Sequence, residues 1–245
     1  MGSFKGETDT VSPLIIFNRA NGACVVTLLE IPSESLRERS IPVLKTKRLV
    51  LRAPRLGDVK AVAALANDRR VAENTARIPH PYRPGDADEF IASANRGNET
   101  TFLIALRDGQ DCSKAIGACG FYQLDRHPPE IGYWLGVEHW GHGYATEAAR
   151  ALIDHIFTDL DCETLQAAAR VTNPASRRVL EKCGFQWTGA GLLRIRAIAS
   201  SAPVDRFRLD RGRLFAFWVS ASPTGSSNGY LGAGGPGYRD AIDRP

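Results

Sequence analysis

The stretch most suited to ligand binding combines two glycines with the start of a helix. Its residues are Gly141, His142, Gly143, Tyr144, Ala145 and Thr146. They follow an alternating segment, residues 130–135, that is typical of a strand, and they precede apolar residues at helical spacing. A helix that begins here has backbone N–H groups without intrahelical partners and a partial positive charge at that end. The turn is therefore suited to a phosphate or pyrophosphate, or it is a tight turn without a ligand.

Other ligand-binding patterns fit this stretch less well. The glycines are not followed by Lys and Ser or Thr as in a P-loop, and Thr146 stands where a dinucleotide-binding loop needs its third glycine. His139 and His142 are close in sequence, but no third ligand is placed near them by the sequence. We therefore expect no metal site.

A second group, residues 173–185, describes one short helix. Asn173 is suited to cap its start, Pro174 fits its first turn, and Gly184 is suited to end it before a strand starts at Phe185. The spacing alone favours a capping role for Asn173.

The surrounding elements alternate between strand and helix signals from residue 43 to residue 218. Asp58 is placed to cap a helix that carries Val62, Leu65 and Ala66. Strands are expected at residues 48–52, 102–106, 115–124, 130–135 and 165–169, and a final alternating stretch follows the second long helical region. This order predicts an α/β fold in which a mixed sheet carries helices on its faces.

Composition places the chain among ordinary globular proteins. It has 245 residues, of which 43% are hydrophobic and 24% charged. The net charge of +4 is too small to indicate a nucleic-acid or membrane partner. The five cysteines contain no pair spaced for zinc or for a disulfide framework, and no apolar run is long enough to span a bilayer. We expect a cytoplasmic monomer or homodimer.

The two ends are predicted to lie outside the main domain, residues 43–218. Residues 1–42 form an extension whose apolar runs around Asn21 and Gly22 indicate a hairpin, or else a segment translated from an upstream start. Residues 219–245 are rich in Gly, Ser and Pro and are expected to form a disordered, dispensable tail.

A run of basic side chains marks the last part of the domain. It contains Arg194, Arg196, Arg206, Arg208, Arg211 and Arg213. Such a run forms a solvated face balanced by Asp205 and Asp210, or it meets an anionic partner.

Three motifs, taken in order, resemble the GNAT superfamily of N-acetyltransferases. They are Tyr133-Trp134-Leu135 with the segment from Trp140 to Ala148, then Asn173-x-x-Ser176, then Glu181-Lys182-x-Gly184-Phe185. The branch they resemble is the Rim type, which includes acetyltransferases of ribosomal-protein N-termini. The resemblance covers residues 43–218.

The resemblance implies a mostly antiparallel sheet of about six to seven strands, splayed in the middle, with helices on both faces. Acetyl-CoA would lie between two central parallel strands, with its pyrophosphate on the amides of residues 141–146. Its pantetheine arm would contact the backbone at Leu135, Gly136 and Val137, and Asn173 and Ser176 near the sulfur. Trp140 stands where many members carry Gln or Arg, which removes one side-chain contact to phosphate.

The resemblance also implies roles in the chemistry. Glu130 would be the general base, acting through water, or it is a solvated carboxylate at a strand end. Residues 177–183 lack the tyrosine that many relatives use toward the thiolate, so Ser176 would replace it. The acceptor would be a protein N-terminal amine or a small amine such as a polyamine, aminoglycoside or amino acid. A non-catalytic acyl-CoA-binding module is the alternative from another class.

Overall fold

The computed structural model describes residues 14–20, 23–29, 41–94, 96–107, 114–123, 127–160 and 162–214. The chain divides into two compact units, Met1–Ser40 and Ile41–Pro245. In the first unit, strands β1 (Leu14–Ala20) and β2 (Ala23–Leu29) pair antiparallel. The expected tail, residues 219–245, lies outside the described residues.

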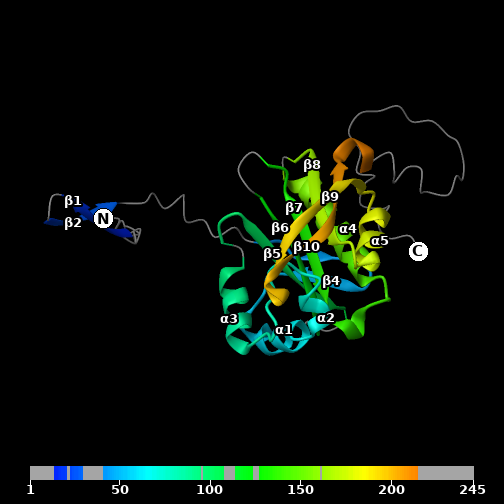
Figure 1. Cartoon of the computed structure of the whole chain (residues 1–245), viewed down its shortest axis with the longest axis horizontal. Coiled ribbons are helices and arrows are strands. Elements are labelled where there is room, and N and C mark those ends of the chain that lie inside the picture. Colours follow the sequence, from blue (N-terminus) through cyan, green and yellow to red (C-terminus); the bar gives the residue numbers. More distant parts are fainter. Residues whose placement is uncertain are drawn as a thin grey trace, which may run out of the picture. The chain divides into compact units, whose positions relative to one another are not determined.

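One sheet runs through the described part of the second unit (Figure 1), in the order β3-β4-β5-β6-β7-β8-β10-β9. The strands are β3 (Leu44–Lys45), β4 (Leu49–Arg52), β5 (Glu99–Leu106), β6 (Ala115–Tyr122), β7 (Glu130–Leu135), β8 (Thr164–Arg170), β9 (Gln186–Ile195) and β10 (Ser200–Asp210). All neighbours pair antiparallel except β7 and β8, which are parallel. The predicted mixed α/β fold is confirmed.

The described sheet has eight strands, against the six to seven expected. The difference lies partly at the C-terminal end, where β9 and β10 form a hairpin in place of one alternating stretch. The chain reverses through the 3-10 turn η4 (Arg196–Ile198) and Ala199, whose φ is 49°. Glycine or asparagine usually takes this left-handed conformation, so an alanine gives no turn signal in the sequence.

Helices cover both faces of the sheet (Figure 1). They are α1 (Val59–Ala66), α2 (Arg69–Ala72), α3 (Pro84–Ser93), α4 (Tyr144–Asp159) and α5 (Pro174–Lys182), with 3-10 turns η2 (Leu56–Asp58) and η3 (Val137–His139). On one face, α4 and α5 bury Phe102, Leu165 and other strand residues in the main core. On the other face, α1 and α3 pack against Leu103 and Trp134.

The parallel pair at the centre of the sheet is short. β7 and β8 are in register only at Glu130 with Gln166 and at Ile131 with Ala167. The remaining four residues of β7 pair with β6 alone, and the rest of β8 pairs with β10. The sheet is therefore open between the C-terminal halves of these two strands.

A buried ion pair joins β4 to the start of α1. The Arg52 guanidinium donates two hydrogen bonds to the Asp58 carboxylate, each 2.8 Å long, and the Arg55 N–H donates a third. Asp58 is thus at the helix start as predicted, but its carboxylate accepts from these groups and does not cap α1. Burial raises the pKa of Asp58, but the bonds from Arg52 and Arg55 outweigh it and hold the pKa below its ordinary value.

We predict that Asp58→Asn lowers the free energy of unfolding at pH 7 by about 3 kcal/mol, because it leaves a buried guanidinium without its counter-ion. Since the folded pKa is depressed, the contribution of Asp58 is present above its unfolded pKa and is lost as pH falls below about 4. In urea unfolding, the difference in free energy of unfolding between wild type and variant should therefore become smaller toward pH 3. Asp88→Asn, an exposed carboxylate of α3, is the control. A difference in free energy of unfolding that does not change with pH would contradict the role of the Asp58–Arg52 ion pair.

Candidate functional site

The turn between β7 and α4 has the conformation that its glycines allow. Gly141 and Gly143 both have φ near +79°, which is the left-handed region. Gly143 is the N-cap of α4, so this sixteen-residue helix begins immediately after it. A residue with a side chain would be strained at either position.

The backbone N–H groups at the start of α4 have no helical acceptors. The first backbone hydrogen bond of the helix is donated by the Glu147 N–H to the Gly143 carbonyl, at 3.1 Å. The amides of Tyr144, Ala145 and Thr146 precede it in the helix, where no intrahelical acceptor exists. With the helix dipole, these amides form the kind of site that binds phosphate.

A basic side chain from the start of β4 braces this turn. The Arg48 guanidinium donates to the His142 carbonyl at 2.9 Å and to the Glu147 carboxylate at 2.7 Å. It also lies over the Tyr144 ring, 4.6 Å from the ring centroid, and His142 stacks on the same ring. Arg48 lies far from the glycines along the chain, so no local pattern in the sequence indicates this contact.

The carboxylate of Glu147 accepts two more hydrogen bonds besides the one from the Arg48 guanidinium. The Thr46 hydroxyl donates to it at 2.6 Å and the Arg48 N–H at 2.8 Å. Burial raises the pKa of Glu147, but the bonds from Thr46 and Arg48 outweigh it and keep this pKa below its ordinary value. Glu147 is therefore ionised near neutral pH. We call the group Thr46, Arg48 and Glu147 the clasp.

The end of β7 presents backbone groups to the open side of the sheet. The Gly136 N–H donates to the Ile116 carbonyl at 2.9 Å, toward β6. Because backbone groups alternate along a strand, those of Leu135 point the other way, toward the gap beside β8. The Trp140 indole N–H donates to the Leu135 carbonyl at 2.8 Å, which holds the turn against the strand end. The Leu135 N–H remains directed into the gap, and Val137 begins the next turn, η3.

The start of α5 contacts β7 through the side chain of Tyr133. The Asn173 side chain accepts from the Ser176 N–H at 3.1 Å, so Asn173 caps α5. The Tyr133 hydroxyl donates to the Ser176 carbonyl oxygen at 3.1 Å, and it lies 3.0 Å from the Ser176 hydroxyl oxygen, where either group can be the donor. Burial raises the pKa of Tyr133, so its hydroxyl keeps its proton. The sequence analysis named Ser176 and missed this use of Tyr133.

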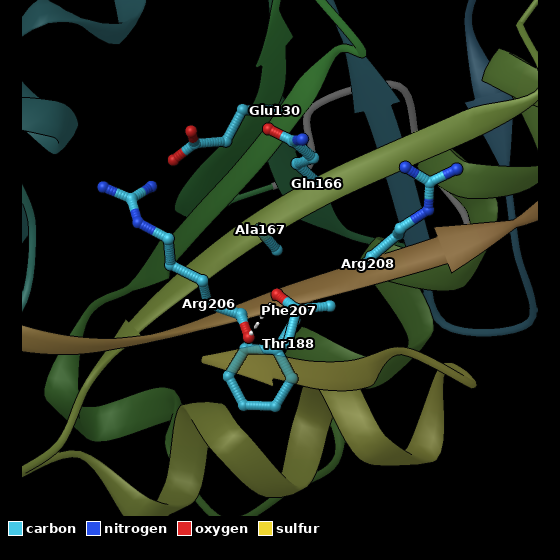
Figure 2. A pocket seen from close by; sticks show the side chains of 7 residues that line it. All are labelled: Glu130, Gln166, Ala167, Thr188, Arg206, Phe207 and Arg208. Carbon is cyan, nitrogen blue, oxygen red and sulfur yellow. Dashed lines mark hydrogen bonds between the residues drawn. The ribbon is translucent and has the colours of Figure 1, made fainter. Parts of the chain in front are cut away.

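A pocket opens on the face of the sheet opposite to Tyr133 and Ser176 (Figure 2). Its volume is about 240 Å³, and its lining residues are Glu130, Gln166, Ala167, Thr188, Arg206, Phe207 and Arg208. Glu130 is the first residue of β7, where the parallel pairing with β8 is still intact. Alternation along β7 puts Glu130 and Tyr133 on opposite faces. The structure therefore brings Ser176 to Tyr133 on one face and leaves Glu130 on the other.

No group of three or more His, Cys, Asp or Glu side chains in the described part of the chain is arranged to hold a metal ion. None of the helices described has both the length and the apolar character needed to cross a bilayer.

Comparison with known proteins gives one family and several relatives. Residues 48–186 match the family described as an acetyltransferase (GNAT) domain. The uncharacterized N-acetyltransferase p20 of Bacillus licheniformis is 33% identical over 151 residues, which are 60% of this chain and 83% of that protein. The ribosomal-protein-serine acetyltransferase of Escherichia coli (strain K12) is 33% identical over 92 residues, which are 37% of this chain and 49% of that protein.

A solved structure has a similar fold. The spermidine N-acetyltransferase from Vibrio cholerae, in complex with CoA and spermine, aligns with a TM-score of 0.57 and 22% sequence identity. The alignment covers 68% of this chain and 98% of that chain. The likeness shows that the two proteins share a fold.

Proposed function

Because this chain belongs to the GNAT family of acetyltransferases, we propose that it is of the Rim type and transfers the acetyl group of acetyl-CoA to the N-terminal amine of a peptide or protein. The family establishes the acetyl-CoA-dependent activity, and the acceptor is the proposed part. The observation that carries the proposal is the juxtaposition of a phosphate-binding helix start, residues 141–146, with the gap beside β7. A relative that acts on a ribosomal-protein serine favours a peptide amine over other acceptors.

Acetyl-CoA supplies the activated acetyl thioester, and this chain has groups suited to each part of it. The unpaired amides at the start of α4 fit the pyrophosphate, and the Arg48 guanidinium adds positive charge beside them. The end of β7 at Leu135, with Gly136 and Val137 in the adjoining turn, would lie along the pantetheine arm. The Asn173 carbonyl oxygen is used by its cap, so its NH₂ group is the part that would donate to the coenzyme.

The acceptor amine must lose a proton when it attacks the thioester carbon. An N–C bond forms, the C–S bond breaks, and the sulfur leaves with the electron pair of that bond. Glu130 lines the pocket, and it would take the amine proton through water. An N-terminal amine has a pKa of about 7.7–8.0, so part of it is already neutral at pH 7 and a carboxylate suffices as base. The Leu135 N–H is directed into the gap, where it would stabilise the developing oxyanion.

The departing thiolate needs a hydrogen-bond donor, and we assign this role to Ser176. A tyrosine hydroxyl has one proton to donate. That proton can go to the carbonyl or to the hydroxyl oxygen of Ser176, both of which lie within hydrogen-bond distance. When it goes to the hydroxyl oxygen, the serine proton is free for the sulfur. Tyr133 is therefore a positioning residue, since it acts through Ser176.

A small polyamine is the second candidate acceptor, because the Vibrio cholerae structure with a similar fold holds spermine. The charges around the pocket favour the first candidate. Arg206 and Arg208 line it beside the single carboxylate Glu130. A polyamine brings several positive charges to these arginines, and like charges brought together are unfavourable.

We predict that free thiol is released from acetyl-CoA with peptides that have a free N-terminus, and not with the same peptides blocked by an N-terminal acetyl group. The blocked peptides with one internal lysine test side-chain acetylation. Spermidine tests the polyamine alternative under the same conditions. Turnover of spermidine without turnover of any free N-terminus would reject the proposed acceptor and leave the acetyltransferase activity intact.

We predict that Gly143→Val weakens CoA binding about 10-fold or more, because a side chain at this φ forces the amides of the turn to move. Isothermal titration with CoA measures the loss, and circular dichroism checks the fold. Gly85→Val in α3, where an added carbon meets nothing within 4 Å, is the matched control. A folded Gly143→Val protein with wild-type CoA affinity would contradict the proposed position of the pyrophosphate.

We predict that Ser176→Ala lowers turnover about 10- to 100-fold at saturating acetyl-CoA and leaves CoA affinity nearly unchanged. Tyr133→Phe should lower turnover less, and it should add little in the Ser176→Ala background because both act through one hydrogen bond. Tyr82→Phe, another buried tyrosine whose hydroxyl donates to a backbone carbonyl, is the control. Melting temperatures separate stability from rate. Independent, additive losses at residues 133 and 176 would contradict the relay.

A further inference from the structure

One arginine in the pocket has no counter-charge among the residues that the structure describes. The Arg208 guanidinium donates to the Asp210 carboxylate at 2.8 Å and to the Thr164 hydroxyl at 3.0 Å. Arg206 lies two residues away on the same face of β10, yet no carboxylate in the described ranges pairs with its guanidinium. Its charge is therefore available to a ligand.

The neighbouring strand leaves room for the Arg206 side chain. A carbon added to Gly191 of β9 would lie 2.8 Å from the Arg206 Nε. Any side chain at that position would push the guanidinium away from its place above β9. Gly191 therefore permits the observed position of Arg206.

The Arg206 guanidinium and the Glu130 carboxylate extend to the same side of the pocket, whereas Arg208 projects to the other side (Figure 2). No ion pair joins Arg206 and Glu130. The pocket thus presents a negative and a positive group side by side, each open to a group of opposite charge.

Bound coenzyme is a poor source of the anion that Arg206 lacks. The phosphate-binding turn follows the C-terminal end of β7, and α4 covers the face that holds Tyr133. Arg206 lies on the opposite face, beside the N-terminal end of β7. An anion bound by Arg206 would therefore come with the acceptor and not with the coenzyme.

We propose that the acceptor is a peptide whose N-terminal segment carries an acidic side chain, and that Arg206 binds this carboxylate while Glu130 faces the amine. The inference rests on the proposed function, because it takes the N-terminal amine as the acceptor. A carboxylate close to the amine satisfies both charges of the pocket at once. A lysine at the same place would meet Arg206 and be disfavoured. The pocket volume of about 240 Å³ suits the end of a chain and not a whole folded surface.

The test compares kcat/KM for three peptides that start with serine and carry aspartate, asparagine or lysine at the next two positions. The aspartate peptide should exceed the asparagine peptide about 10-fold, and the lysine peptide should be the poorest. In Arg206→Gln the ratio of aspartate to asparagine peptide should fall close to one, and in Arg206→Glu the lysine peptide should become the best of the three. Gly191→Ala, which displaces the guanidinium and keeps its charge, should lower the ratio partially.

Arg208→Gln is the matched control, since Arg208 is already bound by Asp210, and it should keep the wild-type ratio. Equal turnover of the three peptides by wild type would overturn this inference and leave the proposed function standing. Loss of the ratio in Arg208→Gln but not in Arg206→Gln would overturn the assignment to Arg206. Turnover of spermidine but of no peptide would overturn the proposed function itself.

Discussion

The whole site depends on how soon the parallel pairing of β7 with β8 stops. Two residue pairs hold the strands together, and beyond them the backbone of β7 faces a gap. A continuous ladder would have used the Leu135 N–H for a strand bond, and no ligand could have bound there. In the proposed reaction the coenzyme on one face and the acceptor on the other would meet through this gap, next to the last paired residues.

The two faces are equipped differently around this gap. One carries the start of α4, the clasp, and the hydroxyls of Tyr133 and Ser176, which suit a phosphate-bearing thioester and its leaving sulfur. The other carries Glu130 and Arg206 in a shallow pocket, which suits an amine. In the proposed reaction the amine would attack from one side of the gap and the thiolate would leave toward the other.

Local features of the site could be predicted from the sequence, and long-range ones could not. The glycines at 141 and 143, the start of α4 and the cap by Asn173 depend on neighbouring residues, so spacing indicates them. Arg48 and Glu147 are 99 residues apart, and Tyr133 and Ser176 are 43 apart, so no local pattern joins them. Asp58 failed as a predicted cap because Arg52 offered its carboxylate a stronger, charged partner.

The clasp ties coenzyme binding to the order in which the chain is made. Thr46 bonds Glu147 across 101 residues, so the phosphate-binding turn is fixed only after both segments have left the ribosome and met in the folded sheet. A nascent or half-unfolded chain consequently has no formed site for the coenzyme. A ligand that binds only the native state adds to its stability, by about 2.7 kcal/mol at a concentration one hundred times its Kd. Acetyl-CoA bound at the proposed site would therefore stabilise the folded enzyme as well as serve as its substrate.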